Sequence, residues 1–291
     1  MTTSCIVTDS SAQFTQPGLP GKQCLKVLQH GLWNVAQQRS ALPKVGDFPK
    51  SITAEFHPQI FSPSDDEIFE LISSSLPLFD EVYILLLSKE ISPLYEKLEK
   101  IAATLHGRAN LHLIDSQNTS AGLGLLVQYA ASLISKGLPA DEVEKSIRLM
   151  VPHIYTVFCT PSLSYLHNAG ILDIGQATVG DLMGLFPLFV LEDGKVNPLQ
   201  KVKNMRSVME YFIEFVDEFD DLAHIALIQP TTPIQSESKV LHQHINEFFE
   251  ETTYTEHSIN VFTASLLGPR GFGMAVMENL EQKEIMFDSL R

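Results

Sequence analysis

Two apolar segments of the chain end in aspartate followed by serine, and these side chains could support chemistry. Residues 4–13 read SCIVTDSSAQ and residues 110–118 read NLHLIDSQN. A carboxylate beside hydroxyl groups at a strand end can bind or polarise a polar ligand group. Asp and Ser side chains in such places also cap loops, because they accept hydrogen bonds from nearby backbone N–H groups. Both interpretations apply to the same set of residues: Asp9, Ser10, Ser11, Asp115 and Ser116.

No established catalytic or metal-binding motif accompanies these residues in the sequence. The chain has no phosphate-binding glycine loop, no dinucleotide-binding glycine motif, no HExxH and no GxSxG. Its cysteines, Cys5, Cys24 and Cys159, lack CxxC spacing, and the HQH of residues 242–244 does not direct both histidines to one side of a helix. We therefore expect no metal and no cofactor, and spacing alone does not identify an enzyme.

Composition restricts the classes of partner. The chain has 291 residues with 44% hydrophobic content, enough for a large core and two domains. Its net charge of −15 repels phosphate groups, so we expect no nucleic acid partner and at most peripheral membrane contact. We recognise no signal peptide, the apolar runs are too short to cross a bilayer, and the odd number of cysteines fits a reduced, cytoplasmic protein.

The elements that position these residues alternate between strand and helix as far as residue 152. Apolar runs at 4–8, 81–88 and 109–116 predict strands, and Ser64 with Glu67 three residues later predicts the start of a helix between them. Such alternation is typical of an α/β unit with a parallel sheet. Because the carboxyl ends of parallel strands meet at one edge, we expect the two Asp-Ser ends on a common rim.

The pattern changes after residue 153. Strands are predicted over HIYTVFCT, over the two arms of a hairpin that turns at Asp193-Gly194, and over INVFTASLL near the end. Helices are predicted between them. The expected architecture is an α/β fold, with a parallel-sheet N-terminal domain at 1–152 and a smaller, mixed-sheet α+β domain at 153–291.

Five stretches of the sequence are similar to those of one known family, in order and in spacing. They are IVTDSS, DSQNTSAGLGLLVQYAASLISKG, TPSLSYLHNAGILDIGQA, FPLFVLEDGKVNPLQKV and LLGPRGFGMA. On these segments, which cover nearly the whole chain, it resembles the DegV family of bacterial two-domain proteins. The resemblance implies a long-chain fatty acid buried between the domains and presented to a separate fatty-acid kinase. It further implies a non-enzymatic carrier in phospholipid metabolism.

The residues that hold the fatty-acid carboxylate in that family are only partly present here. In the stretch IFSPS, Ile60 stands where the family has a threonine that contacts the carboxylate. In ISPLY, the family's carboxylate-binding serine is retained as Ser92, but Pro93 replaces the following glycine and supplies no backbone N–H. The resemblance therefore implies a divergent head-group site around Ser92.

Three further substitutions change the charge of the same site. Ile171 replaces a family arginine, Leu266 replaces a family histidine, and Arg270 replaces a family glycine. Because a buried carboxylate without partners is costly, two interpretations remain. In one, Ser92 and a relocated cation, for which Arg270 is the candidate, bind the carboxylate. In the other, the pocket accepts an uncharged lipid end. Ser10 and Ser116, on the rim beside this site, complete the candidate set.

Three classes of function remain open on this sequence. The first is the fatty-acid or lipid carrier just described. The second is an acyl-handling enzyme or hydrolase that uses Ser92 or Ser10, although the sequence shows no histidine with a recognisable partner near either serine. The third is an interaction protein with a vestigial pocket. Lipid binding is favoured because about 14 methylene groups at about 0.8 kcal/mol each give about 11 kcal/mol of gross burial energy.

Overall fold

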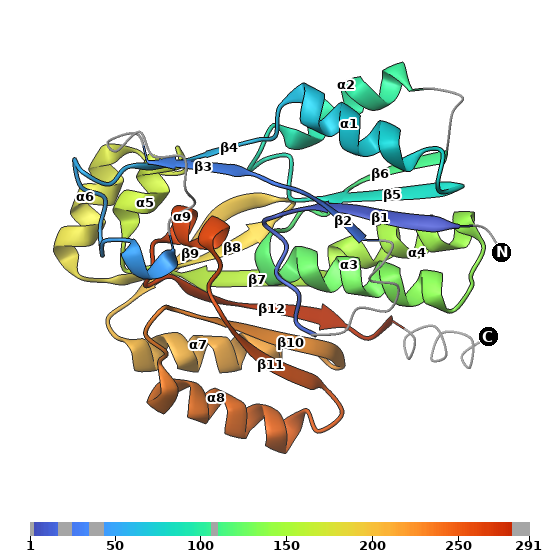
Figure 1. The fold of residues 1–291 in the computed structure, drawn as a ribbon. Coiled ribbons are helices and arrows are strands. Elements are labelled where there is room, and N and C mark those ends of the chain that lie inside the picture. The colour runs from blue at the N-terminus through green and yellow to red at the C-terminus, as the bar shows by residue number, and fades with distance from the viewer. Residues whose placement is uncertain (1–2, 17–24, 35–43, 106–109, 281–291) are drawn as a thin grey trace.

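The computed structural model describes residues 3–16, 25–34, 44–105 and 110–280. A four-stranded sheet with the order β2-β1-β5-β6 forms one half of the molecule (Figure 1). Its strands are β1 (Ser4–Asp9), β2 (Leu25–Leu28), β5 (Glu81–Leu86) and β6 (Asn110–Asp115). All three pairings are parallel, and every residue of β5 is buried. The predicted parallel sheet is therefore confirmed, and the apolar run of β5 reflects burial on both faces.

Helices cover both faces of this sheet. The helices α1 (Asp65–Ser75) and α2 (Leu94–Thr104) lie on one face, and α3 (Ser120–Ser135) and α4 (Ala140–Met150) lie on the other (Figure 1). As predicted, Ser64 caps α1 and exchanges hydrogen bonds with Glu67. The helix α3 is apolar on nearly all sides because it also packs against the second sheet.

The second sheet is mixed and has the order β11-β10-β12-β7-β8-β9. Its strands are β7 (Ile154–Cys159), β8 (Phe186–Glu192), β9 (Lys195–Val202), β10 (Leu222–Gln229), β11 (Thr253–Ser258) and β12 (Phe272–Glu278). Only β10 and β11 pair in parallel. The hairpin between β8 and β9 turns at Asp193 and Gly194, whose φ angles are 50° and 77°, which confirms the predicted turn.

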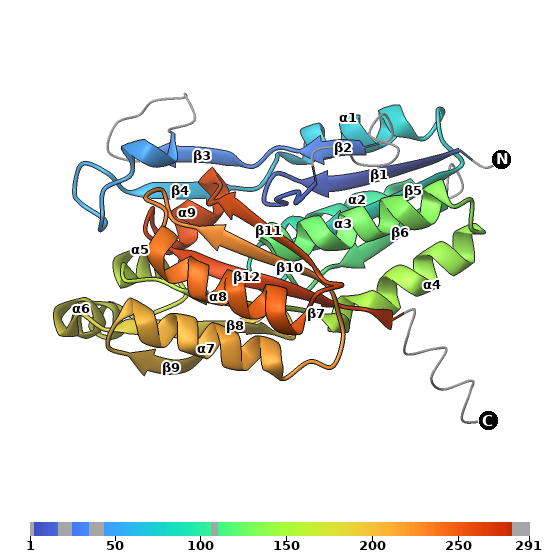
Figure 2. The same cartoon turned by 90° about the horizontal axis from the view of Figure 1, so that it is seen from below.

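Helices also cover the second sheet. The helices α7 (Met205–Asp217) and α8 (Gln235–Phe248) lie across its outer face (Figure 2). The short helices α5 (Leu163–Asn168), α6 (Ile174–Met183) and α9 (Val261–Leu267) lie near the end of the sheet where the β9–α7 and α9–β12 connections run (Figure 1). No helix among the described residues combines the length and apolar character needed to span a bilayer.

One prediction about secondary structure was wrong, and three strands were not anticipated. The stretch INVFTASLL, predicted as a strand, contains α9, because the Asn260 side chain accepts a hydrogen bond of 2.8 Å from Thr263 N and caps a helix there. A short apolar run does not by itself distinguish strand from buried helix. Strands that the sequence pattern did not indicate lie before residue 63: β2 and the antiparallel arm of β3 (Gly31–Asn34) and β4 (Pro58–Phe61).

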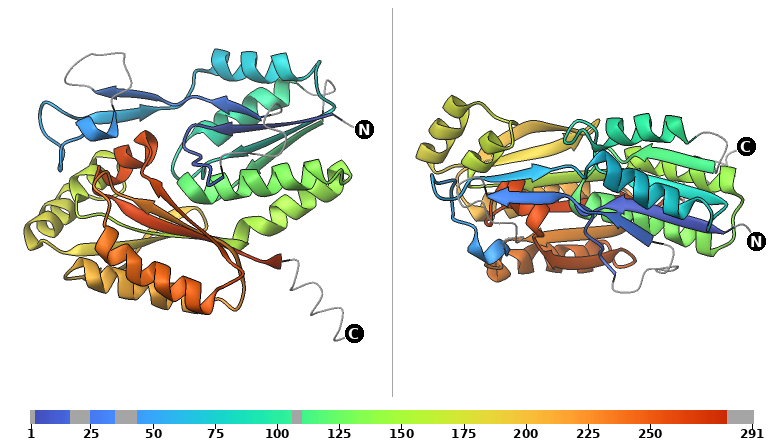
Figure 3. Two further views of the ribbon diagram at one scale, coloured as in Figure 1. Left: turned by 60° about the horizontal axis from the view of Figure 1, so that its bottom comes forward. Right: turned by 45° about the horizontal axis from the view of Figure 1, so that its top comes forward.

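The β3–β4 arm belongs to the first half of the molecule and packs against the second half. It extends from the first sheet and passes over α9 and α5 of the second half (Figure 3). The 3-10 turn Val45–Asp47 follows β3 on the same side. Residues from the N-terminal part of the sequence therefore contribute to the surface above the second sheet.

The rim of the parallel sheet faces the second half. Ser88 Oγ donates to Gly194 O over 2.7 Å, and Asn118 Nδ2 donates to Ile154 O over 3.0 Å. Asn260 Nδ2 donates to Ser11 O over 3.1 Å. We propose that the chain divides near residue 152, since β7, the first strand of the second sheet, begins at Ile154.

Candidate functional site

The carboxylate of Asp9 organises the loop that follows β1. It is fully buried; its Oδ1 accepts from Ser11 N at 2.9 Å and its Oδ2 accepts from Leu87 N at 2.8 Å. These bonds occupy both oxygens with backbone donors of two neighbouring strand ends. The capping interpretation is therefore confirmed for Asp9.

Asp115 and Ser116 have the same role at the end of β6. Asp115 Oδ1 accepts from Gln117 N at 3.0 Å, and burial raises the pKa of this carboxyl group. Ser116 Oγ accepts from Asn118 N and donates to Asn118 O, both at 3.1 Å. Ser116 thus stabilises its own turn, as the capping interpretation predicts.

Ser10 has a histidine neighbour that the sequence did not reveal. Its Oγ accepts from His30 N at 2.9 Å and lies 3.4 Å from His30 Nδ1, and Asp9 Oδ1 lies 3.7 Å from the same nitrogen. A catalytic histidine uses opposite ring nitrogens for serine and aspartate, whereas both contact Nδ1 here. Burial lowers the pKa of His30 despite the charge of Asp9. The three side chains therefore do not form a catalytic triad.

A narrow apolar cavity of about 50 Å³ lies between α3, α9 and the second sheet. Its walls include Ala121, Phe158, Leu166, Leu191, Met274 and Ala275. Ligand sites for lipids and similar molecules are usually about 300–1,000 Å³. An acyl chain can therefore enter only if the lining side chains move apart.

A wider groove of about 490 Å³ adjoins the cavity. The cavity and the groove share only Ile91 and Leu266 among their lining residues. These two side chains therefore form the wall between an apolar interior and a polar groove. The groove is built by β4, the start of α2, the end of α5 and α9.

The polar side of the groove carries hydroxyl, amide and ammonium groups. Ser62 Oγ and Ser92 Oγ lie 3.2 Å apart, and Ser92 Oγ accepts from Leu94 N at 3.3 Å. Lys97 Nζ donates to Pro63 O over 3.2 Å. Asn168 Nδ2 donates to the carbonyl oxygen of Pro58, while its Oδ1 is buried with no hydrogen-bond partner among the described residues.

The structure brings most of the predicted site residues together. Ile60, Ser92, Pro93 and Leu266 line the groove, and Ile171 and Leu266 line the cavity. Ser10 lines a neighbouring hollow of about 250 Å³ that also includes Ile60.

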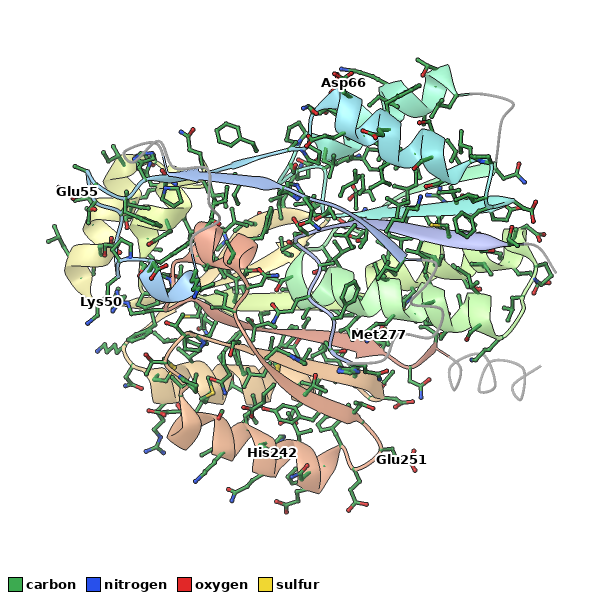
Figure 4. All side chains as sticks on the ribbon, viewed as in Figure 1. Lys50, Glu55, Asp66, His242, Glu251 and Met277 are labelled. Atoms are coloured by element: carbon green, nitrogen blue, oxygen red, sulfur yellow. The ribbon has the colours of Figure 1, made fainter. Side chains whose placement is uncertain are left out.

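Arg270 lies elsewhere. Its Nη2 donates to Pro161 O over 3.3 Å and to Ser162 Oγ over 3.2 Å, and it lines a separate pocket of about 440 Å³ with Lys50. Lys50 and Asp66, which lies in the first turn of α1, are at different sides of the molecule (Figure 4). The structure does not bring Arg270 to the groove.

Lys97 is the cation that sequence reasoning missed. It is the only Lys or Arg among the described residues that line the groove. Pro93 and Lys97 are four residues apart at the start of α2, and this spacing places them on one face of the helix. This spacing can be read from the sequence, but it points to Lys97 only once Pro93 is known to face the groove.

Comparison with known protein sequences gives one family. A family model described as the DegV family matches residues 4–279. A DegV domain-containing protein from Deinococcus radiodurans is 23% identical over 280 residues, which cover 93% of this chain and 97% of that protein. Another from Caldanaerobacter subterraneus is 25% identical over 173 residues; the match covers 60% of this chain and 61%, less than two thirds, of that relative's length.

Solved structures show the same fold. A fatty-acid-binding DegV family protein from Streptococcus agalactiae gives a TM-score of 0.82 at 20% identity, over 96% of this chain and 100% of that chain. A fatty-acid-binding DegV family protein from Thermus thermophilus gives 0.79 at 19% identity, over 95% and 100%. The Fatty Acid Kinase (Fak) B3 protein of Streptococcus pneumoniae, loaded with linoleic acid, gives 0.79 at 16% identity, over 95% and 100%.

Proposed function

The chain belongs to the DegV family, and from that premise we propose that it binds a long-chain fatty acid or a related lipid as a non-enzymatic carrier. The observation that carries this proposal is the polar groove beside the apolar cavity, with Ile91 and Leu266 as their common wall. An amphipathic ligand matches this arrangement, with its polar end beside Ser62 and Ser92 and its tail entering the cavity as the lining side chains move apart.

Burial of the tail is the main source of affinity in this proposal. A chain of about 14 methylene groups contributes about 11 kcal/mol at about 0.8 kcal/mol per group. Loss of free motion on binding opposes this by about 4–15 kcal/mol, and separation of the cavity walls adds to the cost. A good acyl ligand therefore needs both a long tail and favourable contacts at its polar end.

We also propose that a fatty-acid kinase is the partner to which the ligand is presented. Support comes from the likeness to the Streptococcus pneumoniae Fatty Acid Kinase (Fak) B3 protein and from the position of the groove at the surface. Phe61, on its margin, is 49% exposed. In an assay with a purified bacterial fatty-acid kinase and ATP, this chain loaded with palmitate is expected to support phosphoryl transfer to the fatty acid.

Blocking the cavity tests the lipid-binding proposal. Ile171 is partly exposed and lines the cavity, so Ile171→Trp is expected to fill it and to reduce the affinity for a fluorescent fatty acid at least tenfold. Leu172→Trp is the matched control, because Leu172 is similarly exposed but does not line the cavity. Equal affinity of the two variants and the wild type would show that the cavity is not part of the binding site.

A further inference from the structure

We propose that Lys97 supplies the positive charge that binds the ligand's carboxylate in the groove; this inference rests on the proposed lipid-binding function. Lys97 and Ser92 line the same groove; Ser92 lies just before α2, and Lys97 lies in its first turn. The end of a helix where N–H groups lack partners is its positive end, and it favours an anion there. The groove thus combines an ammonium group, two hydroxyl groups and a helix N-terminus.

The Lys97 ammonium group has an N–H donor left for a ligand. One N–H donates to Pro63 O over 3.2 Å. Asp65 Oδ1 is 3.7 Å from Nζ, but this aspartate side chain is 73% exposed, so the pair is weak. An ammonium group has three N–H donors, which leaves at least one to bind a carboxylate.

The serine hydroxyls have a matching hydrogen-bond pattern. Ser92 Oγ already accepts from Leu94 N, so its own proton can point to Ser62 Oγ, 3.2 Å away. The proton of Ser62 is then available for an acceptor in the groove. A carboxylate accepts from both this hydroxyl and the Lys97 ammonium group, whereas an ester or alcohol gains much less from the charge.

The apolar wall strengthens such a contact on one side. Ile60, Ile91 and Leu266 line the groove and exclude water from that side of the head group. Electrostatic interactions are stronger where water is excluded. The Lys97 side chain remains 36% exposed, which screens part of this gain.

Charge-neutral variants of Lys97 test the inference. Palmitate and methyl palmitate are titrated at pH 8 by displacement of an uncharged fluorescent alkyl probe. Lys97→Gln is expected to weaken palmitate binding by about 5- to 20-fold and to leave methyl palmitate unchanged. This loss is close to the low end of the range for a charged hydrogen bond, because the Lys97 side chain is partly exposed. Lys97→Arg is expected to retain most of the preference for the acid.

The controls separate charge from structure. Lys100, on the same helix, is exposed and does not line the groove, so Lys100→Gln is expected to bind both ligands as the wild type does. Arg270→Gln is likewise expected to keep the preference for the acid, because Arg270 lines another pocket. A purely structural role of Lys97 would weaken both ligands equally and leave their affinity ratio unchanged.

Three results would overturn the inference on different grounds. If both ligands bind and the acid-to-ester ratio is the same in the wild type and Lys97→Gln, lipid binding stands and Lys97 is not the anchor. If wild type instead prefers 1-hexadecanol to palmitate, the groove recognises a hydroxyl donor, and Asn168 Oδ1, which has no hydrogen-bond partner among the described residues, is a candidate acceptor. If no alkyl ligand binds the wild type, the proposed function fails together with the inference.

Discussion

Replacement of Ser92 by alanine tests the polar end of the site. Ser92 is 8% exposed, and its hydroxyl contacts Ser62 Oγ at 3.2 Å and Leu94 N at 3.3 Å. The variant removes a hydroxyl group that lines the groove and leaves Leu94 N without its acceptor. Both ligand affinity and fold stability are therefore expected to fall.

The sizes of the two effects differ. Without the Ser92 hydroxyl, the Ser62 hydroxyl is no longer directed to the ligand. Loss of that hydrogen bond weakens binding by about 0.5–1.5 kcal/mol, or about 2- to 13-fold, for a neutral head group, and by up to about 3 kcal/mol, or about 150-fold, for a carboxylate. Loss of the bond to Leu94 N, which is long, costs about 1 kcal/mol of unfolding free energy. The binding loss therefore exceeds the stability loss if the head group is charged.

Fluorescent fatty-acid titration and urea unfolding measure the two effects separately. Ser75→Ala is the matched control, because Ser75 is fully buried in α1 and bonded to Leu71 O but does not line the groove. The control is expected to lose stability and to keep its ligand affinity. An unchanged affinity in Ser92→Ala would refute the position assigned to the head group.

The remaining predictions concern buried polar groups outside the groove. Asp9→Ala leaves Ser11 N and Leu87 N without acceptors and is expected to lower the free energy of unfolding by about 2–5 kcal/mol, measured in urea; a loss below about 1 kcal/mol would contradict the capping role. Burial, with a smaller effect of His257, lowers the pKa of His224 to about 4 from its ordinary value near 6.5. The folded protein then binds fewer protons than the unfolded chain between these values, so this histidine decreases stability as the pH falls below about 6.5. His224→Asn is expected to reduce the stability lost between pH 7.5 and 5 by about 2 kcal/mol, and an identical pH dependence in wild type and variant would contradict this assignment.

Short sequence motifs correctly predicted the helix caps and turns that are fixed by residues close together in the sequence. Ser64 and Glu67 satisfy each other at the start of α1, and Asp193 with Gly194 adopts the positive φ angles that a tight hairpin requires. The Asp-Ser strand ends follow from the same principle, because their hydrogen bonds reach backbone groups nearby in sequence or at adjacent strand ends. Such features depend on few residues and remain readable in the sequence.

Features that depend on distant segments were missed. The groove combines β4, α2, α5 and α9, so neither the presence of Lys97 nor the position of Arg270 follows from spacing along the chain. The contact between Ser10 and His30 arises because β1 and β2 are parallel and Asp9 pairs with Leu28. It could have been anticipated only if residues 25–28 had been assigned to a strand.

Cys24, named in the sequence analysis, lies outside the described residues.

Extraction of the purified protein tests the central claim most directly. The protein is denatured in organic solvent, and the extract is analysed by mass spectrometry beside a buffer blank and an extract of the Ile171→Trp variant. About one long-chain acyl molecule per wild-type chain is expected, with a much smaller amount from the variant with the blocked cavity. Acyl content at the level of the blank in the wild-type extract, combined with no uptake of added palmitate, would contradict the claim that this chain carries a lipid.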